Sequence, residues 1–196
     1  MGFSMISAGT GKIIAIGAST GGVEALEKVL SRFSADIPPI VLVIHMPLGF
    51  TKLFAASFND KMAFSVKEAR TGDNLQWGQA LVAPAGEHME IVNNAGRLSV
   101  RCFDGPKIQH VIPSADVLFN SVANIQKSKA IGVILTGMGA DGAQGLLNMK
   151  QKGALTIGQD KETCAIYGMP KVAMEMGAVM YQLPIDKIGD KIISLI

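Results

Sequence analysis

The sequence predicts an α/β fold, a doubly wound and mainly parallel sheet with helices on both faces and an antiparallel hairpin at its edge. Short apolar runs at 13–16, 40–44 and 130–135 are typical of strands buried on both faces. Segments with helical spacing lie between such runs, and that alternation favours parallel strands. Only residues 88–103 alternate apolar and polar side chains around an Asn-Asn-Ala-Gly turn, as hairpins do.

The remaining elements follow from the same periodicities. Helices are expected at 23–33, 50–58, 114–125, 141–152, 169–176 and 185–196, and further strands at 64–69, 79–83, 154–157 and 179–183. Thr51 is expected to cap the second helix. Pro170 stands at the start of a helix, where proline is tolerated, and Gly153 is expected to end the helix before it. No internal repeat or second domain is apparent.

Composition limits the classes of function. The chain has 196 residues, of which 48% are hydrophobic and 17% charged, enough for one globular domain, expected over 13–196. A net charge of +2 without a basic run predicts no binding of nucleic acid or of a membrane surface. Two cysteines form no disulfide framework and favour a reducing compartment. No apolar run reaches membrane-spanning length. Residues 1–12 read as a linker or cloning remnant, not a signal peptide.

Residues 17–22, GASTGG, are the most informative stretch. They fit the G-x-S-x-G nucleophile pattern and join a strand to a helix. The glycines permit a sharp turn and a close approach of substrate. The amides at the start of the following helix would face negative charge that develops beside Ser19. Ser19 is therefore a candidate nucleophile.

Two other interpretations of Ser19 remain open on the sequence alone. Serine is a favoured helix N-cap, so Ser19 can be structural. A dinucleotide site fits less well, because its fingerprint requires glycine at position 19. Such a site also requires an acidic residue after the second strand, where the chain has His45, Met46 and Pro47.

Three of the predicted strands lead into polar residues with complementary chemistry. Ser19 follows the first strand, His45 the second, and Asp141 comes shortly after the strand at 130–135. The carboxyl ends of parallel strands meet at one sheet edge, so these side chains can form a Ser-His-Asp triad. In such a triad imidazole takes the serine proton, and the carboxylate orients the imidazole and stabilises its protonated form.

The spacing leaves alternatives for two of these roles. His88 or His110 can serve as the base on sequence grounds, and Asp141 can cap the helix that begins beside it. Backbone amides are expected to bind the oxyanion, with Thr20 and Met138 as candidates.

Other chemistry has little support in the sequence. Cys164 has no histidine near it in the chain and is expected to be an inert thiol. Clustered Cys and His, an H-E-x-x-H motif and paired carboxylates are all missing, so neither a metal nor another cofactor is expected.

Six ordered blocks resemble the catalytic domain of the protein-glutamate methylesterases, the CheB family of bacterial chemotaxis. The blocks read IGASTGGV at 16–23, HMP with GFT at 45–51, AP with HM at 83–89, PSADVLF at 113–119, GVILTGMGADGA at 132–143 and GMP at 168–170.

The resemblance implies that Ser19, His45 and Asp141 are nucleophile, base and carboxylate, and it places the family's Gly-Met-Gly turn on Met138. It implies cytoplasmic hydrolysis of glutamate methyl esters on chemoreceptor helices, with deamidation of certain glutamines as a related reaction. Two departures stand out. No receiver domain is recognisable, although one in cis is expected if the chain is a fragment, and Ile112 replaces an arginine that the family often has. The alternatives are a catalytically silent interaction module and a nucleotide-binding regulator.

Overall fold

The computed structural model describes residues 11–126 and 129–196, so most of the predicted linker at 1–12 lies outside the described residues. Seven parallel strands form one sheet in the order β3-β4-β2-β1-β7-β8-β9. These strands are β1 (Ile13–Ala18), β2 (Ile40–Ile44), β3 (Ser65–Glu68), β4 (Gln79–Val82), β7 (Ala130–Ile134), β8 (Leu155–Gln159) and β9 (Tyr181–Leu183). The predicted parallel sheet is confirmed.

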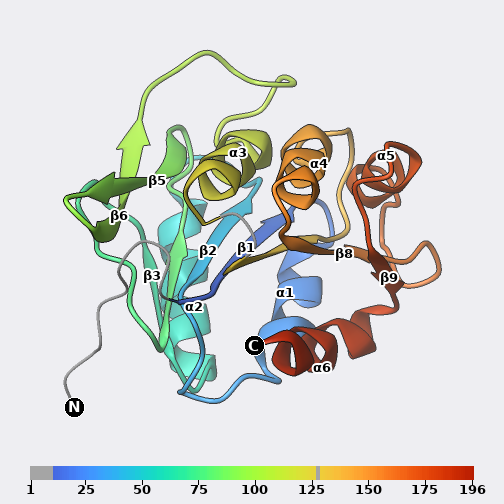
Figure 1. Cartoon of the computed structure of the whole chain (residues 1–196), viewed down its shortest axis with the longest axis horizontal. Helices are drawn as coiled ribbons and strands as arrows, with labels where there is room; N and C mark the ends of the chain where they lie inside the picture. Colours follow the sequence, from blue (N-terminus) through green and yellow to red (C-terminus); the bar gives the residue numbers. More distant parts are fainter. Residues whose placement is uncertain (1–10, 127–128) are drawn as a thin grey trace.

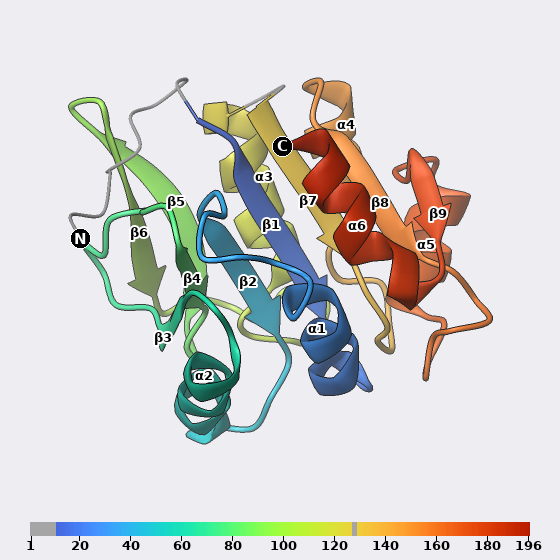
Figure 2. The ribbon, with the colours of Figure 1, turned by 90° about the horizontal axis from the view of Figure 1, so that it is seen from below.

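Helices cover both faces of the sheet (Figure 1). One layer contains α3 (Ala115–Gln126), α4 (Ala143–Gln151) and α5 (Met169–Glu175), and the other contains α1 (Gly22–Leu30), α2 (Phe50–Lys61) and α6 (Ile185–Leu195). Figure 2 shows α1 and α6 lying across the second face. The doubly wound arrangement is therefore confirmed. Within the described residues, no helix is long and apolar enough to cross a membrane.

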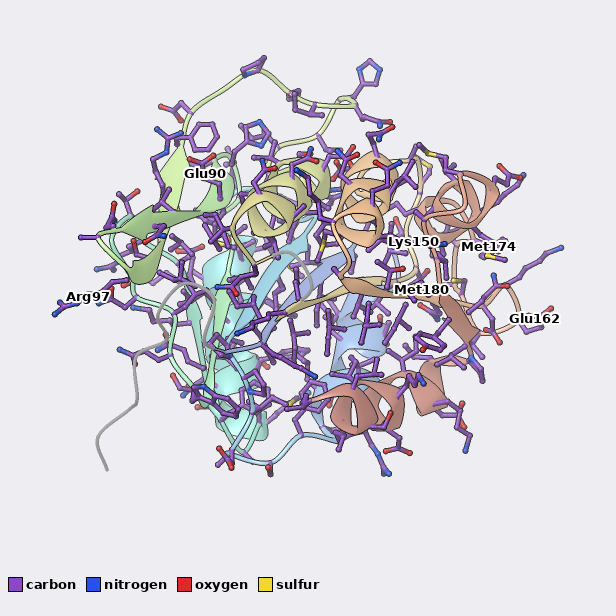
Figure 3. All side chains as sticks on the ribbon, in the orientation of Figure 1. Glu90, Arg97, Lys150, Glu162, Met174 and Met180 are labelled. Atoms are coloured by element: carbon purple, nitrogen blue, oxygen red, sulfur yellow. The ribbon has the colours of Figure 1, made fainter. Side chains whose placement is uncertain are left out.

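The central strand β1 explains why the buried strands are apolar throughout. Ile13 and Ala15 contact the layer of α3, α4 and α5, whereas Ile14 and Ile16 contact the layer of α1, α2 and α6. All four side chains are fully buried. Charged side chains instead extend outward from the rim, as Figure 3 shows for Arg97 and Glu162 at opposite ends of the molecule.

The predicted hairpin is present as β5 (His88–Asn94) and β6 (Arg97–Phe103), which form a separate two-stranded antiparallel sheet. The segment before β4 joins it to the main sheet, because the N–H groups of Gly72 and Leu75 donate to the carbonyls of Val100 and Leu98 at 2.9 Å each. Strand β5 packs against α3. The hairpin therefore extends the layer that contains α3.

The start of α2 differs from expectation. Helix α2 begins after Gly49, whose φ is +82°, and no side chain caps it. The hydroxyl of Thr51 instead donates to Glu68 at 2.6 Å and accepts the Ala85 N–H at 3.0 Å. The predicted Thr51 cap is thus wrong, because this buried threonine ties α2 to β3 and to the loop after β4.

Strand order reverses at β1, and this determines where a ligand can bind. Strands β2, β4 and β3 continue the sheet on one side of β1, and β7, β8 and β9 continue it on the other. Ligands of such sheets bind beyond the carboxyl ends of the strands at this reversal. Ser19 follows β1 and His45 follows β2, and the loop after β7 contains Asp141.

Gly145 lies where α4 packs against α3. A Cβ at this position would lie 2.7 Å from Phe119 Cβ and 3.0 Å from the Asp116 carbonyl oxygen, both of which are fixed by the helix. We expect Gly145→Ala to lower the free energy of unfolding by about 1–3 kcal/mol, measured by urea denaturation. The exposed neighbour Gln144→Ala should change it by less than about 0.5 kcal/mol. Equal midpoints for the two variants would contradict this close helix contact.

Candidate functional site

Ser19 lies at the junction of three strand ends. The register pairs Ala18 with Ile44, and the His45 N–H donates to the Ala18 carbonyl at 3.1 Å, so Ser19 and His45 follow neighbouring positions. The Ser19 N–H donates to the Thr136 carbonyl at 3.0 Å, directly after β7. The backbone therefore holds the serine between β2 and the loop that follows β7.

The structure does not support a capping role for the Ser19 hydroxyl. The N-cap residue of α1 is Gly21, whose φ is +79°, and no side chain caps this helix. Ser19 is partly exposed at the strand-to-helix turn. The Ser19 hydroxyl therefore does not serve as the cap of α1.

The turn after β7 closes tightly against Ser19. A Cβ on Gly137 would lie 2.7 Å from Ser19 Cβ and would also collide with Met169 Sδ, so this approach requires glycine. Met138, the next residue, is 75% exposed. Thr20 follows Ser19 in the chain, and its carbonyl accepts the Thr136 hydroxyl at 3.0 Å. Both residues expected near an oxyanion, Thr20 and Met138, therefore flank Ser19.

His45 and Asp141 are hydrogen-bonded to each other. His45 Nε2 lies 2.9 Å from Asp141 Oδ2, and the carboxylate is nearly inaccessible, with 3% of its side chain exposed. The imidazole is 13% exposed. When Nε2 carries the proton that is donated to the carboxylate, Nδ1 carries the lone pair. In the familiar form of the triad the carboxylate accepts from Nδ1, whereas here it accepts from Nε2, so the two ring nitrogens have exchanged roles.

The remaining partners of Asp141 come from the start of α3. The Ser114 hydroxyl donates to Oδ1 at 2.6 Å, the Ala115 N–H to Oδ2 at 2.6 Å and the Asp116 N–H to Oδ1 at 3.2 Å. Helix α4, which follows Asp141, begins after Gly142 with no side-chain cap. The interpretation of Asp141 as a cap of its own helix is therefore wrong, because its carboxylate caps α3.

Sequence reasoning did not identify Ser114 as part of this cluster. Its position before an Ala-Asp helix start is that of an ordinary N-cap, and its hydroxyl does lie 3.4 Å from the Val117 N–H. Only the tertiary fold brings it to a carboxylate 27 residues away. The sequence around Ser114 therefore indicates a helix N-cap and does not indicate its contact with Asp141.

The charge state of Asp141 results from opposing effects. Burial alone would raise the pKa of the carboxyl group, but hydrogen bonds from His45, Ser114 and Ala115 outweigh burial and lower this pKa below its ordinary value. The carboxylate is thus held as an anion beside the imidazole.

The other two histidines have different surroundings. His88 is 2% exposed; its Nε2 donates to the Pro106 carbonyl at 2.9 Å, and its Nδ1 accepts the Ser114 N–H at 3.2 Å. Both ring nitrogens are therefore occupied. His110 is exposed, in a left-handed conformation with φ of 68°. Of the three histidines, all of which lie in the described part of the chain, only His45 is hydrogen-bonded to Asp141.

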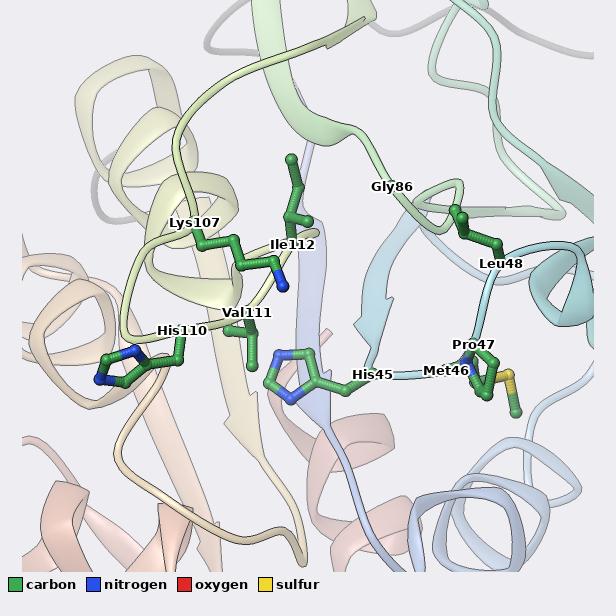
Figure 4. Close-up of a pocket in the computed structure, with 9 residues that line it drawn as sticks. All are labelled: His45, Met46, Pro47, Leu48, Gly86, Lys107, His110, Val111 and Ile112. Atoms are coloured by element: carbon green, nitrogen blue, oxygen red, sulfur yellow. The ribbon is translucent and has the colours of Figure 1, made fainter.

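A cleft of about 490 Å³ opens beside His45. Figure 4 shows His45 between the segment at 107–112 and the segment at 46–48. The lining residues are His45, Met46, Pro47, Leu48, Gly86, Lys107, His110, Val111 and Ile112. The cleft is mostly apolar, with basic side chains on the 107–112 side. Ile112, which departs from the pattern that the six blocks resemble, lines this cleft.

Other reactive groups are less suited to catalysis. Burial raises the pKa of the Cys102 thiol to about 12 and that of the Cys164 thiol to about 11, so few thiolates form near neutral pH. Among the described residues, no group of His, Cys, Asp and Glu side chains is arranged to hold a metal ion.

The fold and this cluster define a doubly wound α/β domain with a polar site at the reversal of its strand order. The chain belongs to the CheB methylesterase family, whose sequence profile matches residues 14–192. It is similar over 95% of its length to the crystal structure of the Thermotoga maritima CheB methylesterase catalytic domain, with 40% identity, a TM-score of 0.93 and full coverage of that chain. The resemblance inferred from the six blocks is thus confirmed.

Two curated relatives extend the comparison. One from Syntrophomonas wolfei is 49% identical over 95% of this chain and 54% of its own length. One from Sulfurimonas denitrificans is 51% identical over 95% of this chain and 53% of its own length. Both carry the name protein-glutamate methylesterase/protein-glutamine glutaminase. The chain therefore spans about half the length of these relatives.

Asp141→Asn should destabilise the protein at neutral pH. Each carboxylate oxygen accepts hydrogen bonds from two donors. The NH₂ group of asparagine would replace one of these oxygens and would then face donors that it cannot accept from. This should lower the free energy of unfolding by about 1–3 kcal/mol. The pKa of the Asp141 carboxyl group is lower in the folded protein than in the unfolded chain. The ionised carboxylate therefore stabilises the fold fully at a pH above the ordinary carboxyl pKa of about 3.9. This stabilisation is lost as the pH falls through the folded-state pKa.

Thermal unfolding of both proteins between about pH 7 and pH 3 tests this. The difference in melting temperature should be largest near neutrality and should narrow below about pH 4. A difference that stays constant across this range would contradict the role of the ionised carboxylate.

Proposed function

We propose that this chain hydrolyses glutamate γ-methyl esters on the cytoplasmic helices of chemoreceptors, with Ser19, His45 and Asp141 as its triad. The observation that carries the proposal is the 2.9 Å hydrogen bond between His45 Nε2 and Asp141 Oδ2, next to the strand end that bears Ser19. The names of the relatives support the choice of substrate and add glutamine deamidation as a related acyl transfer.

The chemistry follows from the two nitrogens of His45. Nδ1 takes the hydroxyl proton while Ser19 Oγ attacks the ester carbonyl, and the imidazolium then returns the proton to the departing methanol. Water, activated by the same nitrogen, hydrolyses the acyl-enzyme and releases glutamate. Asp141 holds Nε2–H throughout and stabilises the imidazolium without taking its proton.

The negative charge of the tetrahedral intermediate requires donors beside Ser19. The backbone N–H groups of Thr20 and Met138 are our candidates, because they flank the serine in the turns after β1 and β7. Within the part of the chain that the structure describes, the Ser19 N–H already donates to the Thr136 carbonyl, and the Met138 N–H makes no backbone hydrogen bond. Two donors of this kind form an oxyanion hole.

The surface around the cleft fits an amphipathic helix as substrate. Leu48, Phe50 and Leu53 are exposed by 75%, 56% and 67% on the α2 side, although large apolar side chains are usually buried. Lys107 lies on the other side. We infer that the apolar side chains contact the apolar face of the receptor helix and that Lys107 pairs with its carboxylates.

The length of the relatives bears on regulation and location. Because the chain spans about half of them, the remainder has room for a further domain, which we propose to be a receiver domain in cis. A substrate on the cytoplasmic helices of receptors would place the reaction in the cytoplasm.

Ser19→Ala should abolish methanol release from methylated receptor. Loss of a triad nucleophile lowers turnover by about 10⁶-fold in a comparable enzyme. The melting temperature should stay the same, because no side chain caps α1. Ser194→Ala, which changes an exposed serine of α6, is the matched control and should keep full activity.

A fluorophosphonate label provides a second readout, since it reacts with activated serines. It should modify Ser19 in the wild-type protein and leave Ser19→Ala unmodified. A folded wild-type protein that neither reacts with the label nor releases methanol would identify a silent interaction module instead.

Lys107→Glu should weaken substrate binding. We expect KM to rise about three- to tenfold with kcat unchanged, because a favourable exposed charge pair becomes a repulsive one. The effect should fade at high ionic strength. Lys152→Glu reverses the charge of an exposed side chain directly after α4 and is the matched control. Equal KM values for the two variants would remove Lys107 from the substrate surface.

A further inference from the structure

The carboxylate of Asp141 is held by more groups than the imidazole alone. Each oxygen accepts two hydrogen bonds, with Ser114 Oγ and the Asp116 N–H on Oδ1 and His45 Nε2 and the Ala115 N–H on Oδ2. The shortest of these bonds, at 2.6 Å, come from Ser114 and Ala115. Hydrogen bonds to a charged acceptor are shorter and stronger than neutral ones.

Ser114 is itself fixed from behind. It is fully buried, and its N–H donates to Nδ1 of the buried His88 at 3.2 Å. The other ring nitrogen of His88 donates to the Pro106 carbonyl. This pattern requires a neutral imidazole with its proton on Nε2, because a proton on Nδ1 would face the Ser114 N–H. A chain of hydrogen bonds therefore runs from His88 through Ser114 and Asp141 to His45.

We propose that Ser114 is a positioning residue of the esterase, which sets the plane of the Asp141 carboxylate and through it the orientation of His45. The inference rests on the proposed function of the triad. Ser114 is buried and does not line the cleft, so it acts on the reaction only through Asp141.

The physical reason lies in the freedom of the carboxylate to rotate about its Cβ–Cγ bond. Two backbone N–H groups of α3 and the Ser114 hydroxyl donate to the carboxylate from fixed positions. His45 Nε2–H is the fourth donor. Without the hydroxyl, Oδ1 retains only the 3.2 Å bond from the Asp116 N–H. The carboxylate can then turn away from His45, and the imidazole loses the orientation in which the proposed mechanism uses Nδ1 as the base for Ser19.

Ser114→Ala tests this role against Ser121→Ala as a matched control. The Ser121 hydroxyl belongs to the same helix, donates to the Leu118 carbonyl at 2.7 Å and accepts the Ile91 N–H at 2.9 Å, but it does not touch Asp141. Both variants remove a structural hydrogen bond, so both should lower the melting temperature by about 2–4 °C. Only Ser114→Ala should lower kcat, by about 10–100-fold, with KM unchanged.

The pH profile separates positioning from mere stability. A carboxylate that turns away from His45 stabilises the imidazolium less. The acid limb of kcat/KM should therefore shift to lower pH in Ser114→Ala and stay in place in Ser121→Ala. Ser114→Thr keeps the hydroxyl and should restore both kcat and the position of the limb.

A readout without substrate keeps this test independent of the esterase activity. The proton NMR resonance of His45 Nε2–H, assigned by its loss in His45→Gln, should shift in Ser114→Ala and remain unchanged in Ser121→Ala. An unchanged resonance together with wild-type kcat in folded Ser114→Ala would overturn the positioning role. A shifted resonance in a protein without esterase activity would keep the role of Ser114 and reject the proposed function instead.

Discussion

The hydrogen bonding of the Asp141 carboxylate at the start of α3 is the interaction on which the site depends. One buried anion satisfies two amides at a helix terminus, a serine hydroxyl and an imidazole. The positive end of the helix dipole favours negative charge there. A group that burial would neutralise thus stays ionised, and the same contacts join the loop after β7 to α3 and to the end of β2.

This arrangement assigns separate tasks to separate parts of the fold. The parallel sheet brings the ends of β1, β2 and β7 together by register alone, through backbone bonds such as Ser19 N–H to Thr136 and His45 N–H to Ala18. Helix α3 supplies the electrostatic environment, and the glycine at 137 lets the turn with Met138 approach the serine. The cleft lined by residues of 45–48 and 107–112 adds the surface that we propose for the substrate.

The three histidines illustrate how surroundings decide chemistry. His45 is hydrogen-bonded to a carboxylate through one nitrogen, and its other nitrogen is the one that we propose as the base. His88 uses both nitrogens inside the fold. His110 is exposed in a loop. Spacing along the chain could not distinguish these residues, because each follows or precedes a structural element in a similar way.

The sequence by itself determined the fold class, most element positions and the order of the strand-end residues, because apolar periodicity and glycine-rich turns are local signals. It also carried the family, through blocks such as GASTGG at 17–22. Only the tertiary structure decided that Asp141 caps α3 and not its own helix, that Thr51 ties α2 to Glu68, and that Ser114 belongs to the site. Each of these contacts joins residues that lie in different elements of the chain. Side-chain hydrogen bonds between such residues produce no periodic pattern in the sequence.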